Sequence, residues 1–262
     1  MAFLLTSSVT YGFVFLCGVI LGSFLNSWIW RTRENIRVIM GRSMCVACHR
    51  TLAWYENIPL FSFIFLRGRC RTCRAPIPRH YPTVEFCMGA LLTIVFAYHM
   101  RLPVFRFEIF WRDIFFTTIL LIIFVYDALY LIILPRIIWL GSVLGFGVNY
   151  FVLGFSLRSL LVGALIGSGV FLLQFVISKG RWIGGGDVRM GFMMGLWLGW
   201  PIVVVALFLS YVSGAIIGVL LLVFKKKTWQ AQIPFGTFLA LGTFTALFYG
   251  NELVTWYLHF LG

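Results

Sequence analysis

Long, uninterrupted apolar segments recur along the whole chain and constrain its fold more than any other feature. A helix needs about 20 apolar residues to cross the roughly 30 Å hydrocarbon core of a bilayer. In lipid the backbone must satisfy its own hydrogen bonds, so only helices and closed barrels can span. The segments here are continuous rather than alternating, which favours helices. With 11% charged residues against about 25% in soluble domains, the 262-residue sequence predicts an all-α polytopic membrane protein.

We expect about eight transmembrane helices. The first carries no basic n-region and is about twice as long as the apolar part of a signal peptide, so we expect it to be retained. The sixth is short because Trp200-Pro201 ends it, and we expect it to be tilted or partly re-entrant. The predicted helices span residues 9–30, 82–100, 109–126, 136–154, 159–178, 188–200, 202–224 and 233–249.

The basic residues indicate the orientation of these helices. The net charge is +13, a value that also occurs in nucleic-acid-binding proteins. With the N-terminus outside, however, the inner loops and helix edges hold 17 of the 21 Lys and Arg residues, as the positive-inside rule requires. We therefore expect the basic residues to contact membrane lipid and not nucleic acid. We expect the triple Lys at 225–227 to anchor a helix end at the cytosolic surface. The inner loops are 31–81, 127–135, 179–187 and 225–232.

A small cytosolic insert, residues 31–81, carries two pairs of closely spaced cysteines. Cys45 and Cys48 form one CxxC pair, and Cys70 and Cys73 form a second. Each pair can direct two thiolates at one ion, and together they complete the closed tetrahedral shell of a structural zinc site. An insert of this size buries little core, so zinc would supply folding free energy.

Two alternatives to four-sulfur zinc ligation remain open. The pairs could form disulfides or redox couples, although the reducing cytosol disfavours both. His49 and His80 flank the cysteines and could replace one of them as a ligand. Cys17 and Cys87 lie in predicted helices, where we expect them to be small apolar residues.

The chain has three aspartates, and two of them are expected at one face of the membrane. Asp113 follows Arg112 near the outer surface, where we expect a solvated or snorkelling pair. Asp127 ends the third predicted helix, and Asp187 follows a run of three glycines just before the sixth. The topology places Asp127 and Asp187 at the cytosolic surface.

A carboxylate at bilayer depth is costly and is by default a functional candidate. One alternative is that each Asp pairs with a nearby Arg: Asp127 with Arg136, and Asp187 with Arg181 or Arg189. A joint site explains both together, because two close carboxyl groups share a proton. One can then act as general base on water while the other polarises a peptide carbonyl.

The three glycines before Asp187 are predicted to form an active-site loop with room for an extended peptide. They are Gly184, Gly185 and Gly186. A phosphate-binding loop is excluded because the GxxxxGK[ST] motif is absent and because the negative charge of Asp187 would repel a phosphate group. No GxSxG nucleophile motif is present either.

Several short motifs occur together in this chain. They are Gly22-Ser23-Phe24-Leu25-Asn26, Asn57-Ile58-Pro59-Leu60, Arg67-Gly68-Arg69-Cys70-Arg71, Tyr81-Pro82 with Glu85, Tyr126-Asp127, Gly184-Gly185-Gly186-Asp187 and Ile233-Pro234-Phe235-Gly236. With them, and with both cysteine pairs, the chain resembles the type IV prepilin peptidase family, whose members are GxGD membrane aspartyl proteases. Departures such as Val46, Glu56 and Arg189 remove no carboxylate or thiolate.

The resemblance implies a bifunctional enzyme of type IV pilus and type II secretion systems in the bacterial inner membrane. It implies cleavage of the short basic leader of prepilins or pseudopilins by Asp127 and Asp187 at the cytosolic face. It also implies N-methylation of the new N-terminus with S-adenosylmethionine, at a cofactor site that no glycine fingerprint locates. Glu34 and Glu56, the only acidic residues of the insert, could meet the basic leader.

The expected organisation is a first transmembrane helix in 1–30, a zinc-binding domain associated with methyl transfer in 31–81, and a transmembrane peptidase domain in 82–262. Two other function classes compete with it. A transporter or channel could use Asp127 and Asp187 as ion-binding carboxylates. A noncatalytic zinc-ribbon scaffold would explain the cysteines but not the aspartates.

Overall fold

The computed structural model describes residues 8–37, 41–224 and 232–261, so the triple Lys at 225–227 lies outside it. These residues form helices and two isolated β-bridges, and no strand occurs among them. The all-α prediction is therefore confirmed. The chain divides into two compact units, Met1–Arg106 and Phe107–Gly262, each of which is described by itself.

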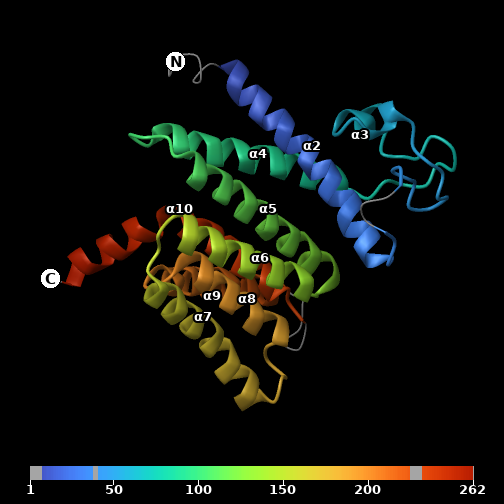
Figure 1. Ribbon diagram of the computed structural model, residues 1–262. Helices are drawn as coiled ribbons and strands as arrows, with labels where there is room; N and C mark the ends of the chain where they lie inside the picture. The colour runs from blue at the N-terminus through green and yellow to red at the C-terminus, as the bar shows by residue number, and fades with distance from the viewer. Residues whose placement is uncertain (1–7, 38–40, 225–231, 262) are drawn as a thin grey trace. The chain divides into compact units, whose positions relative to one another are not determined.

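Each of the eight segments predicted as helices is helical in the structure (Figure 1). The first unit contains α2 (Ser8–Arg33), the 3-10 turn η1 (Trp54–Asn57), α3 (Phe61–Phe65) and α4 (His80–Arg101). The second contains α5 (Phe107–Tyr130), α6 (Pro135–Gly147), the π-turn η2 (Val148–Val152), α7 (Leu157–Ser178), α8 (Gly185–Leu198), α9 (Ile202–Val223) and α10 (Phe235–Leu261).

Five of these helices are long and apolar enough to cross a membrane: α2, α4, α5, α7 and α9. The helix predicted over 188–200 is α8, which has only 14 residues and begins earlier than expected, at Gly185. The helix predicted over 136–154 is α6 with its continuation η2.

In the first unit, α2 and α4 pack backbone to backbone through small residues. A Cβ atom added to Gly18 would lie 2.7 Å from the Cα atom of Gly89, and one added to Gly22 would lie 2.8 Å from the Cα atom of Glu85. Glycines spaced four residues apart are a common means of close helix packing in lipid. The insert that contains α3 joins these two helices (Figure 1).

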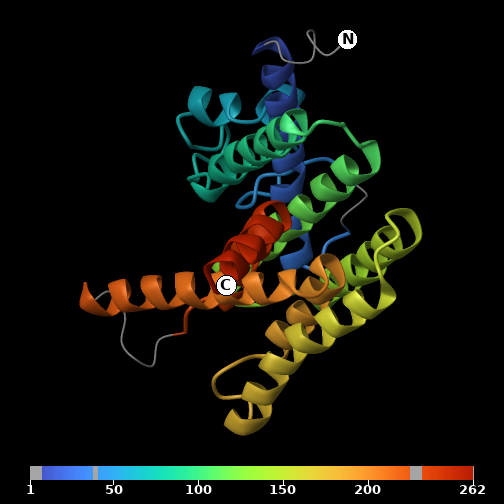
Figure 2. The same cartoon turned by 90° about the vertical axis from the view of Figure 1, so that its left-hand side faces the viewer.

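In the second unit, α7 and α8 also pack through small residues, with glycines on both helices. Figure 2 shows the second unit from another side. Gly163 and Gly167 of α7 face Gly191 and Gly195 of α8. A Cβ atom at any of the four would collide with a backbone atom of the facing helix. The position of α8 along α7 is therefore set by backbone contact. α10 packs against α9 and α5.

A buried tryptophan fixes α8 against α5 and α6. The indole of Trp197 stacks on Phe116 with ring centroids 3.8 Å apart, and its N–H donates to the Gly141 carbonyl oxygen at 2.9 Å. Gly145, one turn further along α6, lies so close to the indole that a side chain there would collide with it. These contacts hold the helix that begins beside Asp187.

Candidate metal centre and aspartate site

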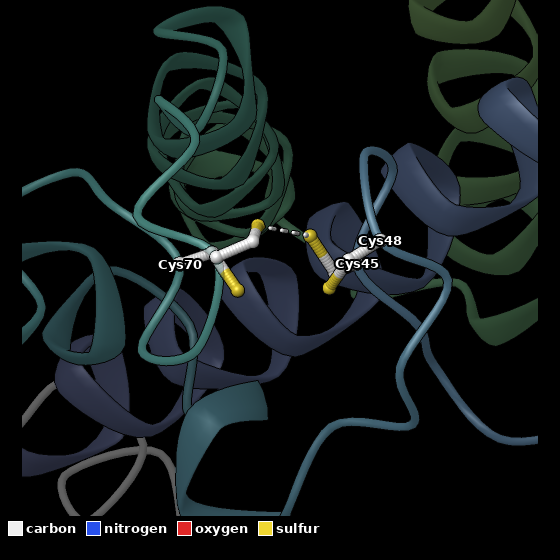
Figure 3. A group of neighbouring side chains, drawn as sticks. Cys45, Cys48 and Cys70 are labelled. Carbon is white, nitrogen blue, oxygen red and sulfur yellow. Dashed lines mark hydrogen bonds between the residues drawn. The ribbon is translucent and has the colours of Figure 1, made fainter.

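Cys45, Cys48, Cys70 and Cys73 are brought together by the fold of the insert. Their sulfur atoms all lie within 4.8 Å of one another, and those of Cys45 and Cys73 are 3.9 Å apart. Tetrahedral zinc with Zn–S bonds of about 2.3 Å requires S–S separations of about 3.8 Å. All four cysteines are free thiols, and Figure 3 shows Cys45 and Cys48 facing Cys70 across the site. The donor set therefore fits a zinc ion, without His49 or His80.

The two cysteine loops have the same backbone construction. In each, the N–H of the first cysteine, Cys45 or Cys70, donates at 2.9 Å to the carbonyl oxygen five residues later. The residue four positions after that cysteine has a left-handed backbone, with φ of 54° at His49 and 58° at Arg74. His49 thus occupies a turn position that Arg74 repeats in the second loop.

Hydrogen bonds around Cys70 favour its thiolate form, which is the form that binds metal. The backbone N–H groups of Cys73 and Thr72 lower the pKa of Cys70 to about 6. Arg50 also reaches Cys70, and both its terminal nitrogens bind the Glu56 carboxylate, at 3.0 and 2.8 Å. This bond from Arg50 holds the pKa of Glu56 below its ordinary value. Glu56 is therefore engaged inside the insert, and a contact with a basic leader is not its role in this structure.

Asp127 lies near the end of α5 and is held by the beginning of α10. Its side chain is buried, and the residue is 4% exposed. The Thr237 N–H donates to Oδ2 at 3.1 Å, and the Gly236 N–H donates to the same carboxylate. Unpaired N–H groups and the helix dipole make a helix N-terminus a favourable place for a carboxylate. The Ile-Pro-Phe-Gly motif, noted in the sequence without a role, supplies this helix end.

Asp187 lies in the first turn of α8 and caps its own helix. Its Oδ2 accepts the Gly184 N–H at 3.1 Å. Gly185 and Gly186 are helical, and Gly184 has an ordinary φ of −81°. The expected active-site loop is thus the N-terminal turn of a helix, because the Asp187 side chain satisfies an N–H that the helix leaves free. Of the three glycines, Gly186 is the most tightly packed.

The two aspartates lie near each other in the second unit. Their carboxylates are within electrostatic reach of each other. Ile133, in the turn after α5, lies between the two helix ends: a Cβ atom on Gly186 would be 3.1 Å from it, and one on Gly236 would be 2.9 Å from it.

The alternative in which each aspartate pairs with a nearby arginine finds no support. Within the ranges described above, neither Asp127 nor Asp187 forms an ion pair. Arg189 instead donates from Nε to the Gly185 carbonyl oxygen at 2.9 Å.

A polar pair beside Asp187 was missed in the sequence. Gln174 of α7 donates to the Tyr211 hydroxyl of α9 at 2.6 Å. The charge of Asp187 acts on Tyr211, whose ring lies 5.3 Å from that of Phe235. The available signal was a Gln inside a 22-residue apolar helix, since polar residues at such positions are commonly functional.

Comparison with known proteins gives the family. A model described as bacterial peptidase A24 N-terminal domain matches residues 16–99, and one described as type IV leader peptidase family matches residues 114–219. The prepilin leader peptidase/N-methyltransferase of Pseudomonas aeruginosa is 31% identical over 94% of this chain and 93% of that protein. The chain belongs to the type IV leader peptidase family.

Other relatives match this family member over similar lengths. The protein of the same description from Stutzerimonas stutzeri is 31% identical, over 93% of this chain and 92% of its own length. The one from Bacillus subtilis is 28% identical, over 94% of this chain and 96% of its own length. No solved structure matches. The four cysteines fall in the N-terminal family model and both aspartates in the leader peptidase model. The comparisons give no support to a transporter or channel.

The third aspartate of this leader peptidase family member departs from the sequence expectation. Asp113 pairs with Arg112 at 2.8 Å, as expected, but it is 2% exposed rather than solvated. Arg112 also donates to Asn149 of the π-turn, and the Asn149 amide donates to the carbonyl oxygens of Leu196 and Trp197. The pair is buried because this network satisfies its charges and links α5 to α8.

Proposed function

We propose that this protein is a membrane aspartic endopeptidase that removes the short basic leader of type IV prepilins and pseudopilins and then N-methylates the new N-terminus. Family membership supports both activities. The observation that carries the peptidase is the meeting of Asp127 and Asp187, each held at a helix N-terminus and neither paired with a cation in the described residues.

Two such carboxyl groups suffice for peptide hydrolysis. The ionised one takes a proton from water as the water oxygen attacks the peptide carbonyl carbon, and the protonated one donates to the carbonyl oxygen. The C–N bond then breaks, and the departing amine takes up a proton. Backbone N–H groups of Thr237 and Gly184 orient the carboxyl groups, and the beginning of α8, with Gly184, Gly185 and Gly186, is the side from which the peptide would approach.

The site would face the cytosol in the bacterial inner membrane. The support for this orientation is the charge distribution, with 17 of the 21 Lys and Arg residues on one side of the predicted topology. The same basic residues would contact anionic lipid. We assign the first helix to 1–30, the zinc-binding domain to 31–81 and the peptidase domain to 82–262.

The cofactors would be structural zinc and S-adenosylmethionine. Cys45, Cys48, Cys70 and Cys73 would hold the zinc, a role that their sulfur spacing supports. S-adenosylmethionine, when bound, would supply the methyl group that the neutral N-terminal amine of the cleaved product receives.

The test is conservative replacement of each aspartate. We expect Asp127→Asn and Asp187→Asn each to lower the rate of leader removal about 10²-fold or more, since each variant loses a general acid or base. Cleavage is read as a gel shift of a co-expressed prepilin, and methylation as the mass of the mature N-terminus. Glu108→Gln, at an exposed position of the helix that carries Asp127, is the control. Normal maturation by either Asn variant would exclude the proposed pair.

A further inference from the structure

The short helix α3 in the insert has an exposed apolar face. Phe61, Ile64 and Phe65 are 55%, 69% and 81% exposed. Residues three and four positions apart lie on one side of a helix, so these three side chains form a single patch. Large exposed apolar patches mark contacts with a protein or with a membrane.

The opposite side of α3 faces α2 and α4. Ser62 and Phe63 line a cavity together with Ser23 of α2. The Leu60 N–H donates to the Glu85 carboxylate of α4 at 2.8 Å, and that carboxylate also accepts the Ser23 hydroxyl. Figure 1 accordingly shows α3 beside α2 rather than beyond its end. The position of α3 along the two long helices is therefore fixed by Ser23 and Glu85.

Both of these residues lie inside segments that are long and apolar enough to cross a membrane. Ser23 lies about 15 Å before the end of α2 at Arg33, at 1.5 Å per residue. From Glu85 to Arg101, at the other end of α4, the helix rises about 24 Å, which is less than the roughly 30 Å hydrocarbon core. If α4 spans the bilayer, Glu85 lies below the surface, and so does the segment bound to it.

The backbone of this segment meets the requirement that lipid imposes. Six N–H groups between residues 61 and 68 donate to carbonyl oxygens of residues 58–64. The Leu60 N–H, which has no such partner, is the one that binds Glu85. A chain at membrane depth must satisfy its backbone groups within the protein. The segment does so although α3 is only five residues long.

The flanking side chains favour lipid over a protein as the occupant of the patch. Trp54 and Tyr55 precede α3 and are exposed, and such aromatic residues are enriched at membrane interfaces. Arg67 and Arg69 follow it and are exposed as well. Their positive charge complements anionic headgroups, which long basic side chains can reach from apolar depth. The same charge would repel a basic leader.

We propose that residues 58–66 form a re-entrant segment in the lipid leaflet at the C-terminal end of α2, with Phe61, Ile64 and Phe65 against acyl chains. By the proposed topology this is the cytosolic leaflet, so the insert is cytosolic only in part. The segment also supplies Glu85 with a hydrogen bond, as an ionisable group at that depth requires. The inference depends on neither proposed activity.

The test places the photoreactive residue p-benzoylphenylalanine at position 65 of the full chain, in nanodiscs of phosphatidylethanolamine and phosphatidylglycerol. Irradiation should attach an acyl chain there, identified by the mass of the fatty acid that remains after alkaline hydrolysis. The control carries the same residue at position 72, where Thr72 is exposed in the second cysteine loop. It should give about tenfold less acyl adduct, because apolar burial distinguishes the two positions. An unchanged melting temperature verifies that each labelled chain is folded.

A charge at the same position gives a second measurement. Phe65→Glu should lower the melting temperature in nanodiscs by about 5 °C or more, since a carboxylate among acyl chains is costly. Thr72→Glu, the matched control, should melt as the wild type does.

Three results would overturn the proposal. One is an equal or absent acyl adduct at positions 65 and 72, and another is a wild-type melting temperature for Phe65→Glu. The third is a bond from position 65 to a second copy of the chain or to a co-expressed prepilin in place of lipid, which would make the patch a protein-binding face.

Discussion

A single methyl group added at Gly236 tests the aspartate site without changing either carboxylate. Gly236 lies in the first turn of α10, where alanine is ordinarily the better helix former by about 1 kcal/mol. In this structure, however, an added Cβ atom would lie 2.9 Å from Oδ2 of Asp127 and 2.9 Å from Cδ1 of Ile133. The methyl group would therefore press on the catalytic candidate and on the residue between the two helix ends.

The expected loss of cleavage rate follows from how far the Asp127 carboxylate must move to restore an ordinary contact distance to the new methyl group. An ordinary contact is 3.4 Å or more, so the carboxylate or the helix end must move by about 0.5 Å. A 1 Å displacement of a reacting group can lower a rate about 10²-fold. On that scale, Gly236→Ala should lower the rate of leader cleavage about tenfold.

The assay is the time course of prepilin cleavage by purified enzyme at saturating substrate. Gly169→Ala is the matched control, because it places the same methyl group on a helix of the same unit where nothing lies within 4 Å. It should cleave normally and unfold at an equal or higher temperature. Wild-type cleavage by Gly236→Ala would show that the contact between α10 and Asp127 does not set the geometry of the reacting groups.

Three further changes probe the rest of the molecule. Cys70→Ser should reduce bound zinc from about one ion per chain to none, measured by metal analysis, whereas retained zinc would contradict four-sulfur ligation. Glu56→Gln removes the partner of Arg50 and should destabilise the insert by about 2 kcal/mol at neutral pH. Because the folded pKa of Glu56 is lowered, this contribution exists above its unfolded pKa of about 4.3 and is lost as pH falls through the folded value. The difference in melting temperature between Glu56→Gln and wild type should therefore vanish in acid, and a constant difference would exclude the ion pair as its source. Gly195→Ala should destabilise the second unit by about 1–3 kcal/mol in denaturant titrations, through collision with Gly163, and unchanged stability would contradict the backbone contact.

The site candidates that the sequence singled out are close together in the chain or stand out because their residue type is scarce. The cysteine pairs are close in sequence, and one ion accounts for four thiols. Asp127 and Asp187 are conspicuous because carboxylates are rare in so apolar a chain.

The features that escaped prediction depend on contacts between distant residues. Thr237 donates to Asp127 across 110 positions, and no periodicity encodes that approach. The burial of Asp113 depends on Asn149, which the π-turn places against α8. The start of α8 was misjudged because glycine is a weak helix former, and here a side-chain cap compensates for it.

The glycine contacts between α7 and α8 also limit how the peptidase half can move. Gly163 and Gly167 face Gly191 and Gly195, so the two helices mesh at intervals of about one turn. A slide of α8 by a fraction of a turn would bring its larger side chains against the α7 backbone at positions that have room only for hydrogen. The glycines of the two helices could face each other again only after α8 had moved along α7 by a whole turn, about 5.4 Å. Asp187, in the first turn of α8, therefore keeps a fixed position along α7, and a substrate must come to the carboxylate rather than draw it along the helix axis.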